Sequence, residues 1–474
     1  MAAAASLLHG EDARSVHPVS PQIVVGPKAI PVAFPGAAIF TCQEPGAFPV
    51  CYDPSQIRTA YNIQALLDGG FTGAGKTIVI VDAFQSPTLV QDLNVFISVF
   101  GLGSMNGLGG SHNARLPTFT QIAPDGLTPF DPSNADEVGW SGEMTLDVEW
   151  AHAIAPGANI VLVLAKSDQD ADILSATKYA VDHRLGDVIS QSFGEDESCV
   201  SSSIASQQHK VFVEATLKNM TLFASSADDG AALPTCDGSS FVKGVSSPAV
   251  DPLVVGVGGT SLKAALVCDT CGTPGTYEGE TVWNDEFGAS GGGYSVLYNK
   301  PFYQLRAVKG SKRAVPDVAY NADIQGGVLV AWSQGDPAQV GSIYIFGGTS
   351  AGSPQWAALL AIADQRAGYD LGFINQGLYL MQLDRRLYPA SLHDITSGNN
   401  SVVITDSNGN RLPITGYSAG PGWDPTTGVG SPKGIYFVDN LLRFVSPLDG
   451  LIGVIESGPL ANKIVPHPGR QRPH

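Results

Sequence analysis

Short apolar runs recur along the chain, and segments with helical spacing separate them. The runs are residues 76–84, 159–165, 187–193, 221–228 and 253–259. Continuous apolar runs of this length are typical of strands that are buried on both faces of a parallel sheet. Segments 143–154, 170–183 and 201–218 have helical spacing, so helices and strands alternate. The pattern predicts an α/β fold with a doubly wound, mostly parallel sheet flanked by helices.

One large domain accounts for this alternation, because no internal repeat divides it. We predict that the domain spans residues 52–445, preceded by an N-terminal extension, residues 1–51, and followed by a C-terminal tail, residues 446–474. Both ends lack sustained periodicity, and we expect them to be peripheral. The opening MAAAASLL has no basic residues and does not resemble a signal peptide. No run of 18 apolar residues occurs, so we expect no membrane span.

The charge balance excludes some partners. The 474 residues include 26 basic and 44 acidic side chains, a formal net charge of -18. This charge opposes binding to nucleic acid or to anionic lipid. Charged residues are only 15% of the chain, whereas Gly (55) and Pro (32) are abundant, as in a loop-rich secreted protein.

Six cysteines are present, and their spacing matches no structural zinc site. We expect disulfides; pairing Cys42 with Cys51 and Cys199 with Cys236 is one of several arrangements that the sequence allows. Cys268 and Cys271 form a lone CxxC, but no thioredoxin-like strand and helix surround it, so redox catalysis is not expected.

Polar residues end three of the predicted strands. In open α/β sheets ligands bind beyond the carboxyl ends of the strands, so Asp82, Ser192 and Asp228 are the first candidates for a site. A fourth candidate, Ser350, follows a Gly-Gly-Thr turn and precedes an apolar helical run. There the helix N-terminus favours negative charge, although a serine at this place can also be a simple helix cap. GGTS occurs twice, and Ser261 in the other copy has no helix after it, so we interpret Ser261 as structural.

Two carboxylates share one face of the helix predicted at residues 143–154. Glu143 and Asp147 are four residues apart, whereas Glu149 falls on another face. They are either a solvated helix face or a buried pair whose pKa values are shifted, and their apolar neighbours favour burial. Asp228 could form an Asx turn instead of a site, and the adjacent Asp229 competes with it.

Taken together, these motifs resemble the sedolisin family of serine-carboxyl peptidases. Residues 348–354 match its GTSxxxP motif, residues 142–149 its GExxLDxE helix, and residues 226–230 its strand-end SGDSG motif. Residues 280–284, 290–295 and 315–323 also look like family signatures. The resemblance extends over nearly all of residues 52–435.

The resemblance implies a subtilisin-like fold and an acid-active endopeptidase. Ser350 would be the nucleophile, Glu143 the general base, and Asp147 would hold and polarise Glu143. Asp228, kept protonated, would donate to the oxyanion together with the Ser350 N–H. The substrates would be proteins or peptides, and we expect a secreted monomer.

Three positions depart from the family pattern. Ala227 replaces a glycine, Phe193 stands where kumamolisin-like members carry tryptophan, and Asp82 stands where they carry a glutamate of an extended proton network. These departures affect the outer proton network and the rim of the pocket, not the four core residues. Family members are made with a long propeptide, and we expect no full-length propeptide within the first fifty residues.

The resemblance also implies one structural calcium ion. Residues 392–400 and 419–432 look like the family's calcium loops. They would supply the carboxylates of Asp394 and Asp424 and the main-chain carbonyls of Ile395, Gly420 and Gly422. Oxygen ligands of this kind suit a hard cation. The alternative is a pair of glycine-rich turns capped by aspartate.

Two other functions compete with this interpretation. A subtilisin-like serine protease shares the GTSxxxP motif but needs a histidine base, and the chain's one His-Gly pair, His9-Gly10, lies in the N-terminal extension. The second is a catalytically silent relative that acts as a binding protein. The four residues Ser350, Glu143, Asp147 and Asp228 argue against both.

Overall fold

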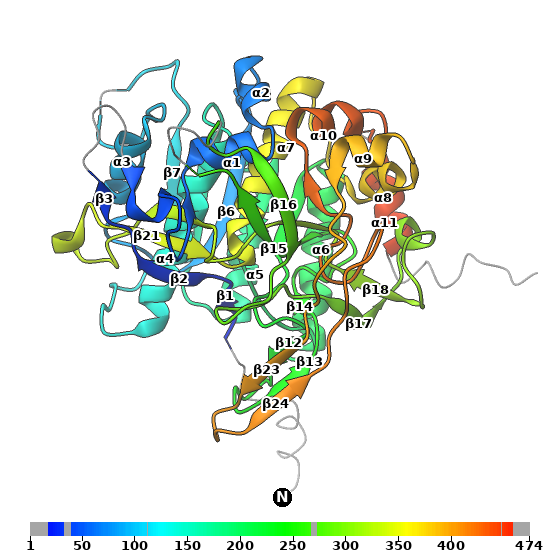
Figure 1. Cartoon of the computed structure of the whole chain (residues 1–474). Coiled ribbons are helices and arrows are strands. Elements are labelled where there is room, and N and C mark those ends of the chain that lie inside the picture. Colours follow the sequence, from blue (N-terminus) through cyan, green and yellow to red (C-terminus); the bar gives the residue numbers. More distant parts are fainter. Residues whose placement is uncertain (1–17, 33–38, 111, 267–272, 447, 458–474) are drawn as a thin grey trace, which may run out of the picture.

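A mostly parallel sheet forms the centre of the computed structural model, which describes residues 18–32, 39–110, 112–266, 273–446 and 448–457. Its strand order is β16-β15-β11-β9-β6-β8-β7, and β19 also pairs with β15 (Figure 1). Only the β15–β16 pair is antiparallel among the described strands of this sheet. The strands are β6 (Thr77–Ala83), β7 (Phe119–Ile122), β8 (Asn159–Ala165), β9 (Val188–Gln191), β11 (Thr221–Ser225), β15 (Val255–Ala264), β16 (Tyr277–Val282) and β19 (Val318–Asn321). The five predicted strands are therefore confirmed.

Helices cover both faces of this sheet. The helices α4 (Ala135–Ile154) and α7 (Ser353–Ala367) pack on each other and on β6, whereas α5 (Asp170–Asp182) and α6 (Ser202–Leu217) pack on each other and on β8 and β11 respectively. This is the doubly wound arrangement that the alternating pattern predicts. The other helices are α1 (Pro54–Ala60), α2 (Gln64–Asp68), α3 (Leu89–Phe100), α8 (Asn375–Leu383), α9 (Leu387–Ser391), α10 (Gly434–Leu441) and α11 (Asp449–Ser457).

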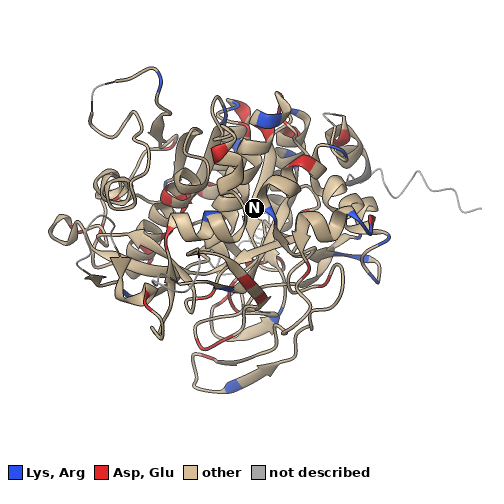
Figure 2. Ribbon diagram, turned by 45° about the horizontal axis from the view of Figure 1, so that its top comes forward, with Lys and Arg blue, Asp and Glu red and all other residues tan. Residues whose placement is uncertain are grey.

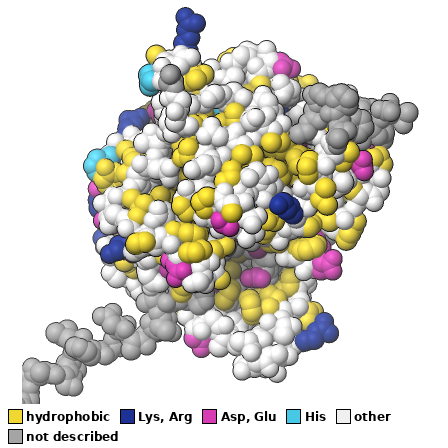
Figure 3. Space-filling model, turned by 90° about the vertical axis from the view of Figure 1, so that its left-hand side faces the viewer, with side chains coloured by type: hydrophobic (Ala, Val, Ile, Leu, Met, Phe, Trp, Pro, Cys, Tyr) yellow, Lys and Arg dark blue, Asp and Glu magenta, His cyan; other side chains and the backbone are white. Residues whose placement is uncertain are grey.

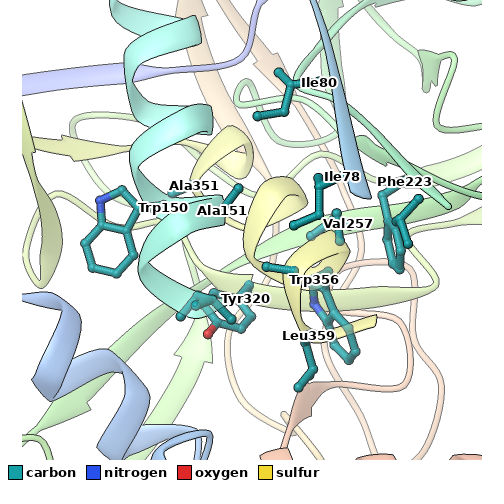
Figure 4. Packing of buried hydrophobic residues seen from close by; sticks show 14 of the residues in the cluster. Ile78, Ile80, Trp150, Ala151, Phe223, Val257, Tyr320, Ala351, Trp356 and Leu359 are labelled. Carbon is teal, nitrogen blue, oxygen red and sulfur yellow. The ribbon is translucent and has the colours of Figure 1, made fainter. Parts of the chain in front are cut away.

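The core lies between the sheet and the α4/α7 pair. Figure 4 shows Trp356 of α7 near Ile78, Phe223 and Val257 from the strands, whereas Trp150 lies on the other side of α4. The helix α4 begins earlier than predicted, where the Asn134 side chain accepts a hydrogen bond from the Asp136 N–H and caps it. From residue 140 to residue 154 every side chain of α4 is buried, so this helix is buried on all sides and not amphipathic.

The N-terminal segment is built into the domain. Strand β2 (Val24–Lys28) joins a second sheet of order β2-β21-β20-β5, which contains β21 (Ile343–Gly347), β20 (Gly327–Ala331) and β5 (Cys51–Tyr52). Strand β1 (Ser20–Pro21) pairs with β10 (Phe193–Asp196). At the other end, α11 packs on α6. The expectation that both ends are peripheral is therefore wrong for their described parts, because their backbones and apolar side chains are used in the fold. The boundaries at 52 and 445 remain predictions.

A small lobe projects from the body at the bottom of Figure 1. It contains the hairpins β12 (Ala232–Pro234) with β13 (Phe241–Lys243) and β23 (Val402–Thr405) with β24 (Arg411–Ile414). The remaining short strands are β3 (Pro31–Val32), β4 (Ile39–Phe40), β14 (Ser246–Ser247), β17 (Gly293–Asn299), β18 (Lys312–Val315), β22 (Leu392–His393) and β25 (Ser431–Pro432).

Disulfides join Cys42 to Cys51 and Cys199 to Cys236, one of the pairings that the sequence left open. The first links β5 to the segment before it. The CxxC of Cys268 and Cys271 lies outside the described residues. In the described part of the chain no helix has the length and apolar character needed to cross a membrane.

Candidate active site

Helix α4 brings two carboxyl groups into the interior. Glu143 and Asp147 are both fully buried, one turn apart on the same face. The solvated alternative is therefore excluded by the structure. Glu149, on another face, is also buried, and its carboxylate accepts a hydrogen bond from the Ala331 N–H at 3.0 Å. That contact gives Glu149 a structural role in holding β20.

Ser350 lies in a 3-10 turn, Thr349–Ala351, between β21 and α7. Its hydroxyl donates to Glu143 Oε2 at 2.9 Å and lies 3.2 Å from the Ser192 carbonyl oxygen. Gly348 starts the turn with φ of +94°, and a Cβ there would lie 2.5 Å from Asp228 Oδ2. A side chain at 348 would therefore displace the carboxyl group beside the serine, which explains the glycine.

A chain of polar groups continues behind Glu143. The Ser192 hydroxyl donates to Asp147 Oδ1 at 2.9 Å. Burial, together with Asp147 and Asp82, holds the pKa of Glu143 well above its usual range, and burial with Asp82 does the same for Asp147. Burial raises the pKa of Asp82 to about 8. Three carboxyl groups this close cannot all ionise, so the cluster keeps protons at acid pH.

Asp228 follows the carboxyl end of β11. Its Oδ1 accepts hydrogen bonds from the N–H and the hydroxyl of Thr349, both at 2.8 Å. Its Oδ2 has no hydrogen-bond partner among the described residues. Burial raises the pKa of Asp228 to about 8, so the carboxyl is neutral in acid and can donate. Asp229 makes a backbone bridge with Ala289 instead, so the geometry distinguishes the two aspartates.

The structure shows the surroundings of the three residues that depart from the family pattern, Ala227, Phe193 and Asp82. Ala227 has φ of +94°, a backbone conformation that glycine adopts without strain, so the alanine is strained where the family has glycine. Phe193 packs on Trp140 of α4, with ring centroids 6.0 Å apart. Asp82 is fully buried at the end of β6, and neither of its carboxyl oxygens has a hydrogen-bond partner in the described structure. The shorter aspartate thus keeps the acidic character of this position.

The structure separates Ser261 from the site. It lies on β15, paired with Thr281 of the antiparallel strand β16. Ser192 is the strand-end residue that the sequence placed near the site, and it contacts both Ser350 and Asp147. Sequence reasoning missed Gln22, whose carbonyl oxygen accepts a hydrogen bond from the Ser350 N–H at 3.0 Å. Nothing in the residues around Gln22 signals this contact, which depends on long-range pairing.

The two loops assigned to calcium lie together. The Gly422 N–H donates to both carboxylate oxygens of Asp394 at 3.1 Å, and the Gly420 N–H donates to Asp424 Oδ2 at 3.1 Å. Ile395 is buried beside Asp394. The described residues contain no group of three or more His, Cys, Asp or Glu side chains that could hold a metal. Two carboxylates supplemented by main-chain carbonyls nevertheless fit a hard cation, so the donor set is compatible with calcium.

Fold and geometry define a serine-carboxyl site on a subtilisin-like α/β fold. No family model matches the sequence. The chain is 34% identical to kumamolisin of Bacillus sp. (strain MN-32) over 423 residues, 86% of this chain and 66% of that protein. It is 30% identical to sedolisin of Pseudomonas sp. (strain 101), over 82% of this chain and 59% of that protein.

Among solved structures, Pseudomonas sedolisin, a serine-carboxyl proteinase complexed with two molecules of pseudo-iodotyrostatin, matches with a TM-score of 0.65 at 27% identity, over 84% of this chain and 99% of that one. The chain belongs to the sedolisin family. It spans less than two thirds of the length of the curated relatives kumamolisin and sedolisin.

Proposed function

We propose that this protein is an acid-active serine-carboxyl endopeptidase that hydrolyses peptide bonds through an acyl-enzyme on Ser350. The observation that carries the proposal is the 2.9 Å hydrogen bond from the Ser350 hydroxyl to buried Glu143. A serine is a weak nucleophile until a neighbouring base accepts its proton, and Glu143 is that base. Family membership supports the reaction class.

The proton moves along the cluster on α4 and β6. As Ser350 Oγ attacks the substrate carbonyl carbon, its proton passes to Glu143, which later delivers it to the leaving amine. The Ser350 hydroxyl donates to Glu143 and the Ser192 hydroxyl donates to Asp147, so the carboxyl groups of the cluster share its protons and its negative charge. A water molecule then hydrolyses the acyl-enzyme by the same proton path in reverse.

The developing oxyanion lies between two donors. One is the N–H of Ser350, and the other is the neutral carboxyl of Asp228, whose Oδ2 is the unpaired oxygen next to Gly348. The Thr349 contacts fix the other oxygen of Asp228 and so orient the group. The donor is lost when Asp228 ionises, which restricts this chemistry to pH values below its raised pKa.

Calcium, if bound, would have a structural role. We propose that Asp394 and Asp424, with the carbonyls of Ile395, Gly420 and Gly422, hold one ion that links the two loops. Neutralising two carboxylates that share a small volume stabilises the folded loops.

Proteins or peptides are the proposed substrates, taken by a secreted monomer. The two disulfides favour an oxidising compartment. Figure 2 shows the Lys and Arg positions of the described residues scattered along the ribbon, and acidic residues outnumber basic ones in the sequence. These features favour neither nucleic acid nor an anionic membrane as a partner.

An imidazole base is the competing mechanism. Among the described residues, Ser350 Oγ contacts Glu143 and Ser192 but no histidine. Buried His152 bonds the Gly103 carbonyl oxygen instead. The geometry therefore favours the carboxyl base over a subtilisin-type triad.

Digestion of a denatured protein between about pH 3 and 5 tests the proposal. We expect wild type to digest it and to react with a peptide aldehyde, Ser350→Ala to do neither, and Ser261→Ala to do both. An optimum near or above neutrality would favour an imidazole base. If the folded wild type neither digests the protein nor reacts with the peptide aldehyde, the catalytically silent relative becomes the better interpretation.

A further inference from the structure

A cavity of about 300 Å³ borders the candidate active site beside Asp228. Its lining is acidic and apolar, and it includes Glu195 and Asp196 of β10, Asp228 and Asp229 after β11, and Leu233, Pro234 and Phe287. No lysine, arginine or histidine is among the described residues that line it. Figure 3 shows a hollow with an acidic side chain in it on one face of the molecule. The composition of these walls suits a ligand group with a positive charge and an apolar stem.

Gln22 shows where a peptide residue places its side chain at this site. Its backbone N–H donates to the Ser192 carbonyl oxygen at 3.2 Å, and its carbonyl oxygen accepts from the Ser350 N–H at 3.0 Å. Its side-chain amide donates to the Gly194 carbonyl oxygen at 3.4 Å, on the wall of the cavity. A substrate residue whose carbonyl takes the place of the Gln22 carbonyl therefore directs its side chain to the cavity. Room remains there for a side chain longer than that of glutamine.

Asp229 supplies an unpaired carboxyl group to the cavity. Residues 226–230 match the SGDSG motif, but an aspartate stands at 229 where the motif has its second serine. The carboxyl group of Asp229 makes no hydrogen bond or ion pair within the described part of the chain, and burial raises its pKa to about 6. In acid the empty cavity therefore holds Asp229 protonated. A cation beside it favours the ionised form.

The titratable groups around Asp229 add no positive charge. They are Asp196, Glu195, Asp228 and, on the loop before Ala289, Asp285 and Glu286. Glu195 is 7% exposed, and neither of its carboxyl oxygens has a hydrogen-bond partner among the described residues. Burial and the carboxyl group of Asp170 raise the pKa of Glu195 to about 10, so it stays neutral. Lys243 of the neighbouring strand β13 lies over the Tyr417 ring, 4.0 Å from its centroid.

We propose that this cavity binds the lysine or arginine side chain of the substrate residue whose carbonyl Ser350 attacks, with Asp229 as the counter-charge; the inference rests on the proposed function. The charged group pairs with the Asp229 carboxylate and donates to the neutral carboxyl group of Glu195. Leu233 and Phe287 cover the apolar stem. Because the pairing requires ionised Asp229, the preference for a basic side chain increases as pH rises from about 4 to about 6.

Two peptides that differ only at this residue test the proposal. One has arginine, and the other has citrulline, which has nearly the same shape but no charge. We expect wild type at about pH 6 to cleave the arginine peptide with a kcat/KM roughly ten- to a hundredfold higher, and the ratio to be smaller at about pH 4. Asp229→Asn should bring the ratio close to one, and Asp229→Glu, which keeps the charge, should restore part of it. Asp237→Asn is the matched control, because Asp237 is an exposed carboxylate between β12 and β13, and it should keep the wild-type ratio.

A binding measurement tests the cavity without catalysis. Benzamidine is a small cation, and benzamide is a neutral molecule of similar shape. Calorimetry on the full-length Ser350→Ala protein at about pH 6 should show tighter binding of benzamidine than of benzamide, and adding Asp229→Asn should weaken benzamidine binding roughly tenfold or more.

The outcomes separate this inference from the proposed function. Equal kcat/KM for the two peptides, an unchanged ratio in Asp229→Asn, or equal binding of benzamidine and benzamide overturns the inference, and cleavage of both peptides by wild type leaves the proposed function intact. Benzamidine binding that depends on Asp229, without cleavage of either peptide, supports the cation site and contradicts the proposed function.

Discussion

Replacing Asp82 by asparagine should make the protein more stable at neutral pH but not in acid. Asp82 is fully buried on β6, and its two carboxyl oxygens have no hydrogen-bond partner among the described residues. Burial raises its pKa from the usual 3.8 to about 8. The amide has nearly the same shape and cannot ionise, so the substitution removes the titration with little change in packing.

The magnitude follows from the difference between the folded and the unfolded pKa. A raised pKa means that the folded state keeps a proton that the unfolded state has lost. The resulting contribution to stability is fully present below the unfolded pKa, near 4, and is lost as pH rises towards 8. One pKa unit corresponds to about 1.36 kcal/mol. The free energy of unfolding of Asp82→Asn, relative to wild type, should therefore rise by on the order of 4 kcal/mol between pH 4 and pH 7.

Urea unfolding at both pH values measures this gain. The Ser350→Ala background should be used for both proteins to prevent self-digestion. Asp237→Asn is the control, because hydrogen bonds from Thr235 and Ser239 lower the pKa of the exposed Asp237 to about 2 and it is ionised at both pH values. If the free energies of unfolding of Asp82→Asn and its parent differ by the same amount at pH 4 and at pH 7, the reasoning is refuted.

Three further predictions concern the site and the calcium loops. Asp228→Ala should lower kcat by roughly a hundred- to a thousandfold with little change in KM, whereas Asp229→Ala should have only a mild effect on kcat. Asp228→Asn should show a weaker fall in kcat at alkaline pH than wild type. An undiminished kcat in Asp228→Ala would mean that other groups hold the oxyanion. The double variant Glu143→Gln, Asp147→Asn should lose less kcat than the product of the losses of the two single variants. A loss of kcat equal to that product would show that the two residues are not coupled. EDTA at neutral pH should lower the Tm of the Ser350→Ala protein but not of its Asp424→Ala derivative, and an unchanged melting curve would count against bound calcium.

The sequence predicted the alternation of helices and strands because the apolar pattern is local. Each buried strand carries its own signal in seven to nine residues, and β6, β8 and β11 were found this way. The role of residues 18–32 could not be found, since β1 and β2 have partners more than 170 residues away, and short strands of mixed burial have no distinct periodicity. Pairing of this kind depends on the completed domain.

The candidate site was predictable for a similar reason. Ser350, Glu143 and Asp228 each lie in a motif of several residues, so the resemblance to the family could single them out as candidates. The strain at Ala227 and the loss of hydrogen-bond partners at Asp82 were not visible, because a backbone angle and a buried environment are properties of the assembled structure.

The site is assembled from parts of the chain that are far apart. The Ser350–Glu143 hydrogen bond joins residues 207 positions apart, and the Thr349–Asp228 contact joins residues 121 apart. Contacts of such long range form late in folding, after the sheet that carries them. A partly folded or nascent chain therefore has neither an activated serine nor an oxyanion donor. Under the proposed function, this topology delays digestion until the molecule is complete, and so spares unfolded sister chains.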